Sequence, residues 1–138
     1  MRILGIDYGD SRAGLAISDA LGITAQGLET VHHNGNDKIL LKRLEEVINE
    51  YEIGCIVVGK PLNMNGTSSE RVEVTEKFIH KLKCRFNKIE IATVDERLTT
   101  VQAHRTMIDL NIKGKDKRNL VDTISAVYIL ETYMNKGK

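Results

Sequence analysis

The chain has 138 residues, of which 41% are hydrophobic and 28% are charged, a composition typical of a globular protein with one core. Its 20 Lys and Arg residues nearly balance 19 Asp and Glu residues, so net charge alone favours neither nucleic acid nor an anionic membrane as a partner. No apolar run approaches the roughly 20 residues that span a bilayer, and the segment after Met1 has the pattern of a strand and not of a leader. We therefore expect a single cytoplasmic domain over residues 1–138.

The start of the chain predicts antiparallel strands. Residues 2–7 and 13–18 are two short apolar runs, and the turn between them contains Gly9. Two such runs around a tight turn are typical of a β-hairpin. Residues 26–32 form a further run, which we expect to add a third strand to the same sheet.

The pattern changes from strand to helix at Asn36. Apolar residues then recur at helical spacing as far as Tyr51, with Asn36 or Asp37 as the capping residue and Gly54 as the end of the helix. The next run, residues 55–59, is short and rich in β-branched side chains, which predicts a buried strand.

A second helix is predicted from Thr67 and Glu70, whose spacing matches a capping box. The apolar face of this helix continues to Phe86. Residues 89–94 then have the composition of another strand.

The last part of the chain is predicted to be helical. Thr99 and Gln102 give a second capping box, for a helix that extends to about Leu110, and a basic loop over residues 113–118 precedes the final helix. The order is therefore β-β-β-α-β-α-β-α-α. This order predicts an α/β fold with a mixed five-stranded sheet, antiparallel over its first three strands and parallel over the rest, and with helices on both faces.

Acidic residues stand at the ends of two predicted strands and near the start of the last helix. Asp7 ends the first strand, Asp95 and Glu96 end the last one, and Asp122 lies one turn into the final helix. Sites in such sheets form at the carboxyl ends of parallel strands, so these acids could converge. Carboxylates packed together repel one another unless cations neutralise them, and hard oxygen ligands suit Mg²⁺ or Mn²⁺. Two such ions would suit the cleavage of a phosphodiester bond.

Each acid also has a purely structural interpretation. Asp95 could cap the helix that follows it, and Asp122 could pair with Arg118 four residues earlier. Neighbouring residues of a strand point to opposite faces, so Asp95 and Glu96 cannot both face Asp7. Periodicity does not decide between the two.

Basic residues flank the same strand ends, where they would hold a phosphate backbone. They are Arg12, Lys60, Arg71 and Arg97, together with Lys113, Lys115, Lys117 and Arg118 before Asp122. A solvated loop is the alternative interpretation of the last four cations. Because the chain has no Trp and only 4% aromatic residues, base stacking is expected to contribute little to recognition.

Four motifs resemble the YqgF family, in the right order and over nearly the whole chain: GIDYGDSRAGLAISD, VGKPLNMNG, VDERLTT and KDKRNLVDTISAVYIL. Members of that family are small bacterial proteins with an RNase H-like fold. They are described as Holliday junction resolvase-like proteins or as nucleases that mature the 5′ end of pre-16S rRNA. The resemblance implies a hydrolase with a two-metal nuclease site that uses Mg²⁺ or Mn²⁺.

The resemblance also implies roles for particular residues. By motif position, Asp7, Glu96 and Asp122 are the catalytic acids that bind the metal ions. The residues expected to bind the substrate or brace the site are Arg12, Lys60, Arg97 and Thr99, with Lys115 and Arg118 as further basic candidates.

Precursor rRNA is the first expected substrate, with a ribosome precursor as a possible partner, and branched DNA is the second. A resolvase that makes paired nicks needs two sites and hence a symmetric dimer, so monomer and homodimer both stay open. Two other classes compete with the nuclease. One is a nucleotide-binding phosphotransferase, whose relatives use two such lobes, and the other is an RNA-binding module whose acids carry out no chemistry.

Overall fold

The computed structural model describes residues 1–60, 70–95 and 114–136. The elements are, in chain order, β1 (Arg2–Tyr8), β2 (Arg12–Ser18), β3 (Ala25–His32), α1 (Asp37–Tyr51), β4 (Ile53–Lys60), α2 (Glu70–Arg85), β5 (Glu90–Asp95) and α4 (Gly114–Lys136). None of these helices has the length and apolar content that crossing a bilayer requires.

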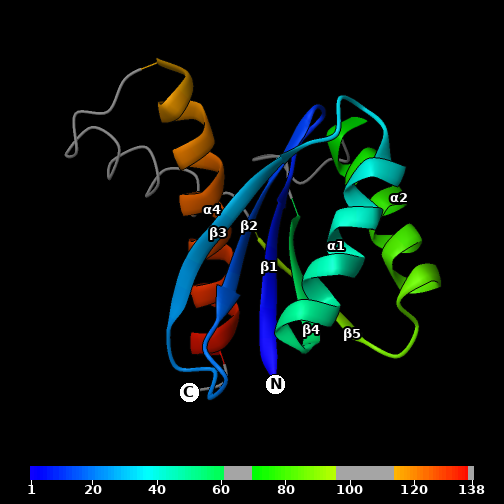
Figure 1. The fold of residues 1–138 in the computed structure, drawn as a ribbon. Coiled ribbons are helices and arrows are strands. Elements are labelled where there is room, and N and C mark those ends of the chain that lie inside the picture. The colour runs from blue at the N-terminus through cyan, green and yellow to red at the C-terminus, as the bar shows by residue number, and fades with distance from the viewer. Residues whose placement is uncertain (61–69, 96–113, 137–138) are drawn as a thin grey trace.

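The described strands form one mixed sheet in the order β3-β2-β1-β4-β5. β2 is antiparallel to both β1 and β3, whereas β4 is parallel to both β1 and β5. In Figure 1, α4 covers one face of the sheet, and α1 and α2 cover the other. The predicted hairpin, the mixed five-stranded sheet and the helices on both faces are therefore confirmed.

Side chains of β1 alternate between the two faces of the sheet. Leu4, Ile6 and Tyr8 are buried in the larger hydrophobic cluster, which they share with side chains of α1 and α2. Ile3 packs instead against the two smaller clusters that contain α4 side chains, and Gly5 faces α4 directly. Odd-numbered residues of β1 therefore face α4, and even-numbered residues face α1 and α2.

Helix α4 packs directly on the backbone of β1 at Gly5. A Cβ atom at Gly5 would lie 2.9 Å from the carbonyl oxygen of Ala126 and 3.0 Å from the Cβ atom of Leu130. At Gly27 of β3, a Cβ atom would lie 3.2 Å from the Cβ atom of Thr123. Because protein interiors are close-packed, larger residues at these two positions would push the helix away from the sheet. The two glycines thus set the height of α4 above the sheet.

Helix α1 begins as predicted but ends earlier. Asn36 is the N-cap, and its side-chain oxygen accepts a backbone N–H of the first turn at 3.1 Å. Glu52 closes the helix in the left-handed conformation, with φ of 54°. The prediction that Gly54 ends the helix is wrong, because β4 already begins at Ile53.

The predicted basic loop over residues 113–118 is wrong for most of its length, because α4 begins at Gly114. Lys and Arg are good helix formers, so this basic stretch extends the helix toward its N-terminus. Lys115 and Arg118 therefore lie in the first turns of α4 and not in a loop.

The second predicted helix is confirmed in its described part, as α2 from Glu70 to Arg85. The capping residue predicted for it, Thr67, lies outside the described residues. The helix predicted from Thr99 to Leu110 lies outside them as well.

Candidate active site

The carboxyl ends of three neighbouring strands meet at one edge of the sheet. β1, β4 and β5 run parallel, and Lys60 at the end of β4 pairs in register with Asp95 at the end of β5. Asp7 is the next-to-last residue of β1. Ligand sites of α/β sheets form at such edges, so the described strands place Asp7 where a site is expected.

Asp7 lies partly buried on the face of the sheet that α4 covers. Gly5, two residues earlier, faces Ala126 and Leu130 of α4, and the alternation of a strand returns position 7 to the same face. Helix α4 runs in the opposite direction to β1 (Figure 1). Asp122 precedes Ala126 by about one helical turn, so its position in the helix lies toward the same edge as Asp7.

Within the sheet, glycines lie directly beside Asp7 on both neighbouring strands. Gly14 is its partner on β2. On β4 the register pairs Ile6 with Val58, so the next residue, Gly59, lies beside Asp7. Directly opposite residues share a face, and neither glycine has a side chain that could cover the carboxylate. Neither neighbouring strand therefore places a side chain directly beside Asp7 on this face.

The Asp7 carboxylate has the chemistry that a hard cation requires. Within the described residues, no hydrogen bond or ion pair engages it, and a partly buried charge without a partner is unfavourable until a cation or water satisfies it. Residues 1–60, 70–95 and 114–136 contain no group of three potential metal ligands. Of the other two predicted acids, Glu96 lies outside the described residues and Asp122 is described only by its place in α4.

The predicted cations Arg12 and Lys60 lie on opposite faces of the sheet. Ala13 is buried in the cluster on the α1 and α2 side, so strand alternation places Arg12 on the α4 face with Asp7. Lys60 faces α2, where its Nζ atom lies 2.9 Å from Oε1 of Glu76. Two further candidates, Arg97 and Thr99, lie outside the described residues. Lys115 and Arg118 are described only by their positions in α4.

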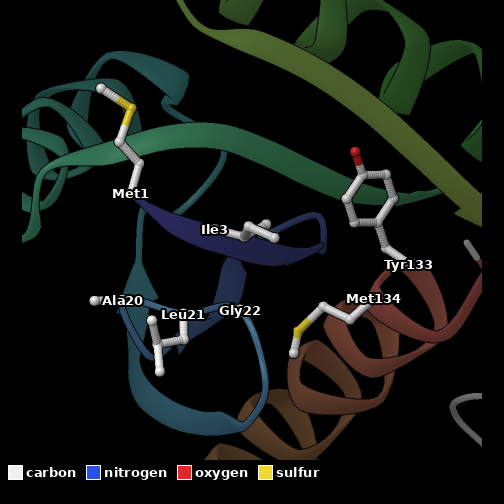
Figure 2. Close-up of a pocket in the computed structure, with 7 residues that line it drawn as sticks. All are labelled: Met1, Ile3, Ala20, Leu21, Gly22, Tyr133 and Met134. Atoms are coloured by element: carbon white, nitrogen blue, oxygen red, sulfur yellow. The ribbon is translucent and has the colours of Figure 1, made fainter. Parts of the chain in front are cut away.

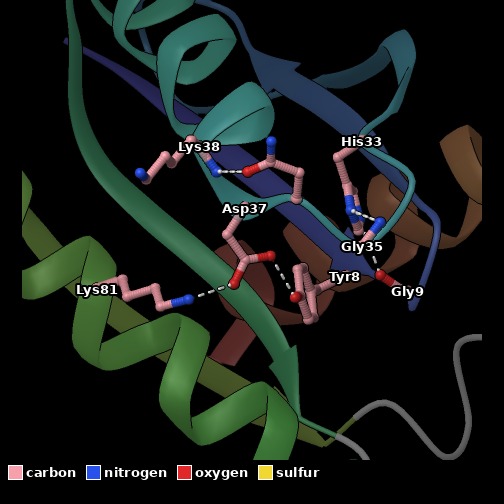
Figure 3. Close-up of polar contacts among 8 residues, drawn as sticks. Tyr8, Gly9, His33, Gly35, Asp37, Lys38 and Lys81 are labelled. Atoms are coloured by element: carbon pink, nitrogen blue, oxygen red, sulfur yellow. Dashed lines mark hydrogen bonds and ion pairs between the residues drawn. The ribbon is translucent and has the colours of Figure 1, made fainter.

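A polar contact on the opposite face anchors the residue next to Asp7 (Figure 3). The Tyr8 hydroxyl donates to Oδ1 of Asp37 at 2.6 Å, and Nζ of Lys81 lies 2.9 Å from Oδ2 of the same carboxylate. The Tyr8 ring also stacks on Phe78, with 4.1 Å between the ring centroids. The sequence suggested Asp37 only as a helix cap, because its partners lie 29 and 44 residues away.

Within the Tyr8–Asp37 hydrogen bond, the charge resides on Asp37. Burial by itself would raise the pKa of Asp37, but the Tyr8 hydroxyl and the Lys81 ammonium outweigh it and leave the pKa below its usual range. Burial, followed by the hydrogen bond to Asp37, raises the pKa of Tyr8 far above its ordinary value. Tyr8 therefore remains a donor and Asp37 remains an acceptor at every physiological pH.

Asp37→Asn is expected to lower the free energy of unfolding by about 1 kcal/mol at pH 7, since a charge-assisted hydrogen bond becomes a neutral one. Lys81 is half-exposed and contributes little to this loss. Because the pKa of Asp37 is depressed in the folded state, its contribution is complete above the unfolded pKa of about 3.9 and disappears as the pH falls below it. Denaturant unfolding from pH 7 to pH 3 would test this, and a difference that stays constant over that range would contradict it.

A cavity of about 700 Å³ lies at the other end of the sheet (Figure 2). Met1, Leu21, Tyr133 and Met134 are among the residues that line it. Met1 precedes β1, whereas Asp7 is near the end of that strand. None of the lining residues belongs to the predicted site, so the cavity is separate from it.

Residues 1–136 match the profile of the family described as "RuvX: Holliday junction resolvase". A protein of Ruminiclostridium cellulolyticum is 54% identical over 136 residues, which cover 99% of this chain and 95% of the relative. A protein of Acetivibrio thermocellus is 52% identical over 139 residues, which cover 100% of this chain and 99% of the relative. Both relatives are named "Putative pre-16S rRNA nuclease".

Solved structures of two resolvases share the fold. Thermus thermophilus RuvC in complex with a Holliday junction superposes with a TM-score of 0.56 at 16% identity, over 99% of this chain and 96% of RuvC. The fowlpox virus Holliday junction resolvase superposes with a TM-score of 0.62 at 14% identity, over 100% of both chains. The predicted RNase H-like fold is therefore confirmed.

Proposed function

Because the chain belongs to the RuvX family of Holliday junction resolvases, we propose that it is a nuclease that uses divalent metal ions to hydrolyse phosphodiester bonds. The observation that carries this proposal is the Asp7 carboxylate at the carboxyl edge of the sheet, bordered within the sheet by the glycines of β2 and β4. A carboxylate in this position can hold a cation against a phosphate.

The proposed metal ligands are Asp7, Glu96 and Asp122. Glu96 is proposed over its neighbour Asp95 because of its position in the VDERLTT motif, and it lies outside the described residues. Asp122 lies in α4, the helix that covers this face of the sheet, which supports it as the third proposed acid.

This choice between neighbouring acids makes a direct prediction. Glu96→Gln is expected to lower the cleavage rate at saturating Mg²⁺ by at least about a hundredfold, whereas Asp95→Asn should stay within about threefold of wild type. Initial rates of the two purified variants, measured in parallel, provide the test. The reverse order of effects would assign the ligand to Asp95.

The residues of the chain position both the ions and the substrate in this proposal. When bound, divalent ions supply activation of the attacking water and stabilisation of the leaving oxygen. Arg12 lies on the face of Asp7, and we propose that its guanidinium binds a phosphate of the substrate. Gly14 and Gly59 place no side chain between Asp7 and an approaching ligand.

The other proposed substrate contacts come from the rim of the site. Lys60 ends β4 on the α2 side, so it would bind the substrate at the edge of the sheet and give up its ion pair with Glu76. The remaining basic and polar candidates follow from motif position: Arg97, Thr99, Lys115 and Arg118. Because the net charge is +1, we expect modest affinity that falls with salt, and a ribosome precursor could supplement it.

We propose a precursor of 16S rRNA as the substrate, because relatives 52–54% identical over the full chain carry that name. Branched DNA is the second candidate, and the family description favours it. A four-way junction requires paired nicks and thus a symmetric dimer, whereas trimming of one RNA end does not.

Cleavage of a 5′-extended 16S rRNA fragment and of a four-way DNA junction, side by side, tests the proposal. Each substrate is incubated with wild-type protein in Mg²⁺, in Mn²⁺ and in EDTA. Metal-dependent cutting of the RNA alone supports the proposal as stated. Cutting of the junction alone would support the proposed nuclease activity but would make branched DNA its substrate. Binding of RNA without cutting in any metal would leave a non-catalytic RNA-binding module as the function.

A further inference from the structure

His33 lies in the turn between β3 and α1 and is completely buried. Figure 3 shows both of its ring nitrogens against backbone: Nε2 lies 2.9 Å from the carbonyl oxygen of Gly9, and the N–H of Gly35 donates to Nδ1 at 3.1 Å. A backbone N–H can only donate, so Nδ1 is the acceptor and carries no proton. Nε2 therefore carries the proton and donates it to the Gly9 carbonyl.

Stacked rings hold the imidazole in this orientation. Its ring lies parallel to that of Tyr8, with 5.5 Å between the centroids and 3° between the planes. Tyr8 stacks in turn on Phe78 and donates its hydroxyl proton to Asp37. The imidazole plane is therefore fixed by packing, and its donor is aimed at one carbonyl group.

The Gly9 carbonyl belongs to the turn between β1 and β2, which connects Asp7 to Arg12. Two further hydrogen bonds tie the same two turns together: the backbone N–H groups of His33 and Asn34 both donate to the carbonyl oxygen of Ser11, at 3.0 and 2.9 Å. The side chain of Ser11 is exposed, so its backbone and not its packing fixes the place of the turn. The β3–α1 turn thus holds the β1–β2 turn at two carbonyl groups.

We infer that His33 is a positioning residue that holds the β1–β2 turn, through the Gly9 carbonyl, in the conformation in which Asp7 binds metal and Arg12 binds phosphate. This inference rests on the proposed nuclease function. His33 itself touches neither metal nor substrate, since backbone groups occupy both ring nitrogens. Partners that orient metal ligands in this indirect way typically contribute tenfold to a hundredfold in metal affinity or activity.

Two substitutions of His33 separate its two hydrogen bonds. In His33→Gln the side-chain amide nitrogen reaches about as far as Nε2, so it can donate to Gly9. In His33→Asn the shorter side chain reaches only as far as Nδ1, so it can accept from Gly35 but not donate to Gly9. Both variants lose the stacked ring and keep a neutral amide, so they form a matched pair.

Mn²⁺ binding by each variant, measured by electron paramagnetic resonance, is the primary readout. His33→Asn is expected to bind Mn²⁺ about tenfold more weakly than wild type and to lose about tenfold to a hundredfold in kcat, with KM for the RNA within about twofold. His33→Gln should bind Mn²⁺ more tightly than His33→Asn and have a higher kcat, with both values close to those of wild type. Equal losses in the two variants would overturn the inference, because the imidazole would then act only by filling its site.

The hydrogen bonds of His33 can also be tested in wild-type protein, so this test does not depend on whether a variant folds. Nitrogen-15 chemical shifts of the His33 ring must show the proton on Nε2, and a proton on Nδ1 or on both nitrogens at neutral pH would overturn the inference. Failure of the proposed function is distinguishable from this. A wild-type protein that binds Mn²⁺ but cuts nothing would contradict the nuclease, while the comparison of Mn²⁺ affinities would still decide the role of His33.

Discussion

Asp7→Asn is expected to lower metal-dependent cleavage by at least about a hundredfold while leaving the fold intact. Asparagine has the shape of aspartate but lacks the negative charge that a divalent cation requires. A bound ion contributes several kcal/mol to the transition state, and each 1.36 kcal/mol is a factor of ten in rate. The fold should survive because no hydrogen bond or ion pair among the described residues depends on this carboxylate.

The test of Asp7→Asn is the initial rate at saturating Mg²⁺, with circular dichroism and thermal melting to establish the fold. Asp19→Asn is the matched control. Asp19 follows β2 at the opposite end from Asp7, and its Oδ1 atom accepts the N–H groups of Ile23 and Thr24. The asparagine oxygen can accept the same bonds, so cleavage should stay at the wild-type rate. Cleavage by Asp7→Asn at that rate would contradict the assignment.

Gly5→Ala is expected to lower the free energy of unfolding by about 1–3 kcal/mol, the usual cost of overpacking a core. The added methyl would meet the carbonyl oxygen of Ala126 at 2.9 Å and Leu130 at 3.0 Å. Backbone of a packed helix cannot move aside locally, so α4 must shift as a whole. Because α4 carries Asp122 and β1 carries Asp7, the shift should also lower the cleavage rate.

Gly54→Ala is the matched control for Gly5→Ala, since it adds the same methyl group within a neighbouring strand of the sheet. The three atoms nearest to the new Cβ atom all belong to the side chain of Met1, which is flexible and 87% exposed. Its effect on stability should stay within about 1 kcal/mol, and cleavage should not change. Equal melting temperatures for the two variants would show that α4 does not depend on Gly5 for its place.

The arrangement of the sheet could be predicted from the sequence because its signals are local. Two apolar runs around Gly9 indicate a hairpin, and a strand–helix–strand order indicates parallel pairing; both follow from a few neighbouring residues. Asp7 could be proposed as a site residue because an acid that closes an apolar strand is unfavourable without a partner. Local signals failed at residues 114–118, where Lys and Arg that could belong to a loop or a helix form a helix.

The faces of the sheet could not be predicted, because β4 is buried on both sides and its apolar run does not alternate. Only the packing shows that Lys60 faces α2 while Asp7 faces α4. The contacts of Tyr8 and His33 could not be predicted from the sequence for a related reason. His33 meets Gly9 over a separation of 24 residues, and no short motif relates two such positions.

The central claim is that acids at the carboxyl edge of this sheet bind divalent ions with which the chain cuts nucleic acid. The most direct measurement is a Mg²⁺ titration of wild-type protein freed of metal, with the initial rate of cleavage of a 5′-extended 16S rRNA fragment as the readout. We predict no cutting in EDTA and a rate that rises to saturation as Mg²⁺ is restored. Cutting at the full rate in EDTA would contradict the claim.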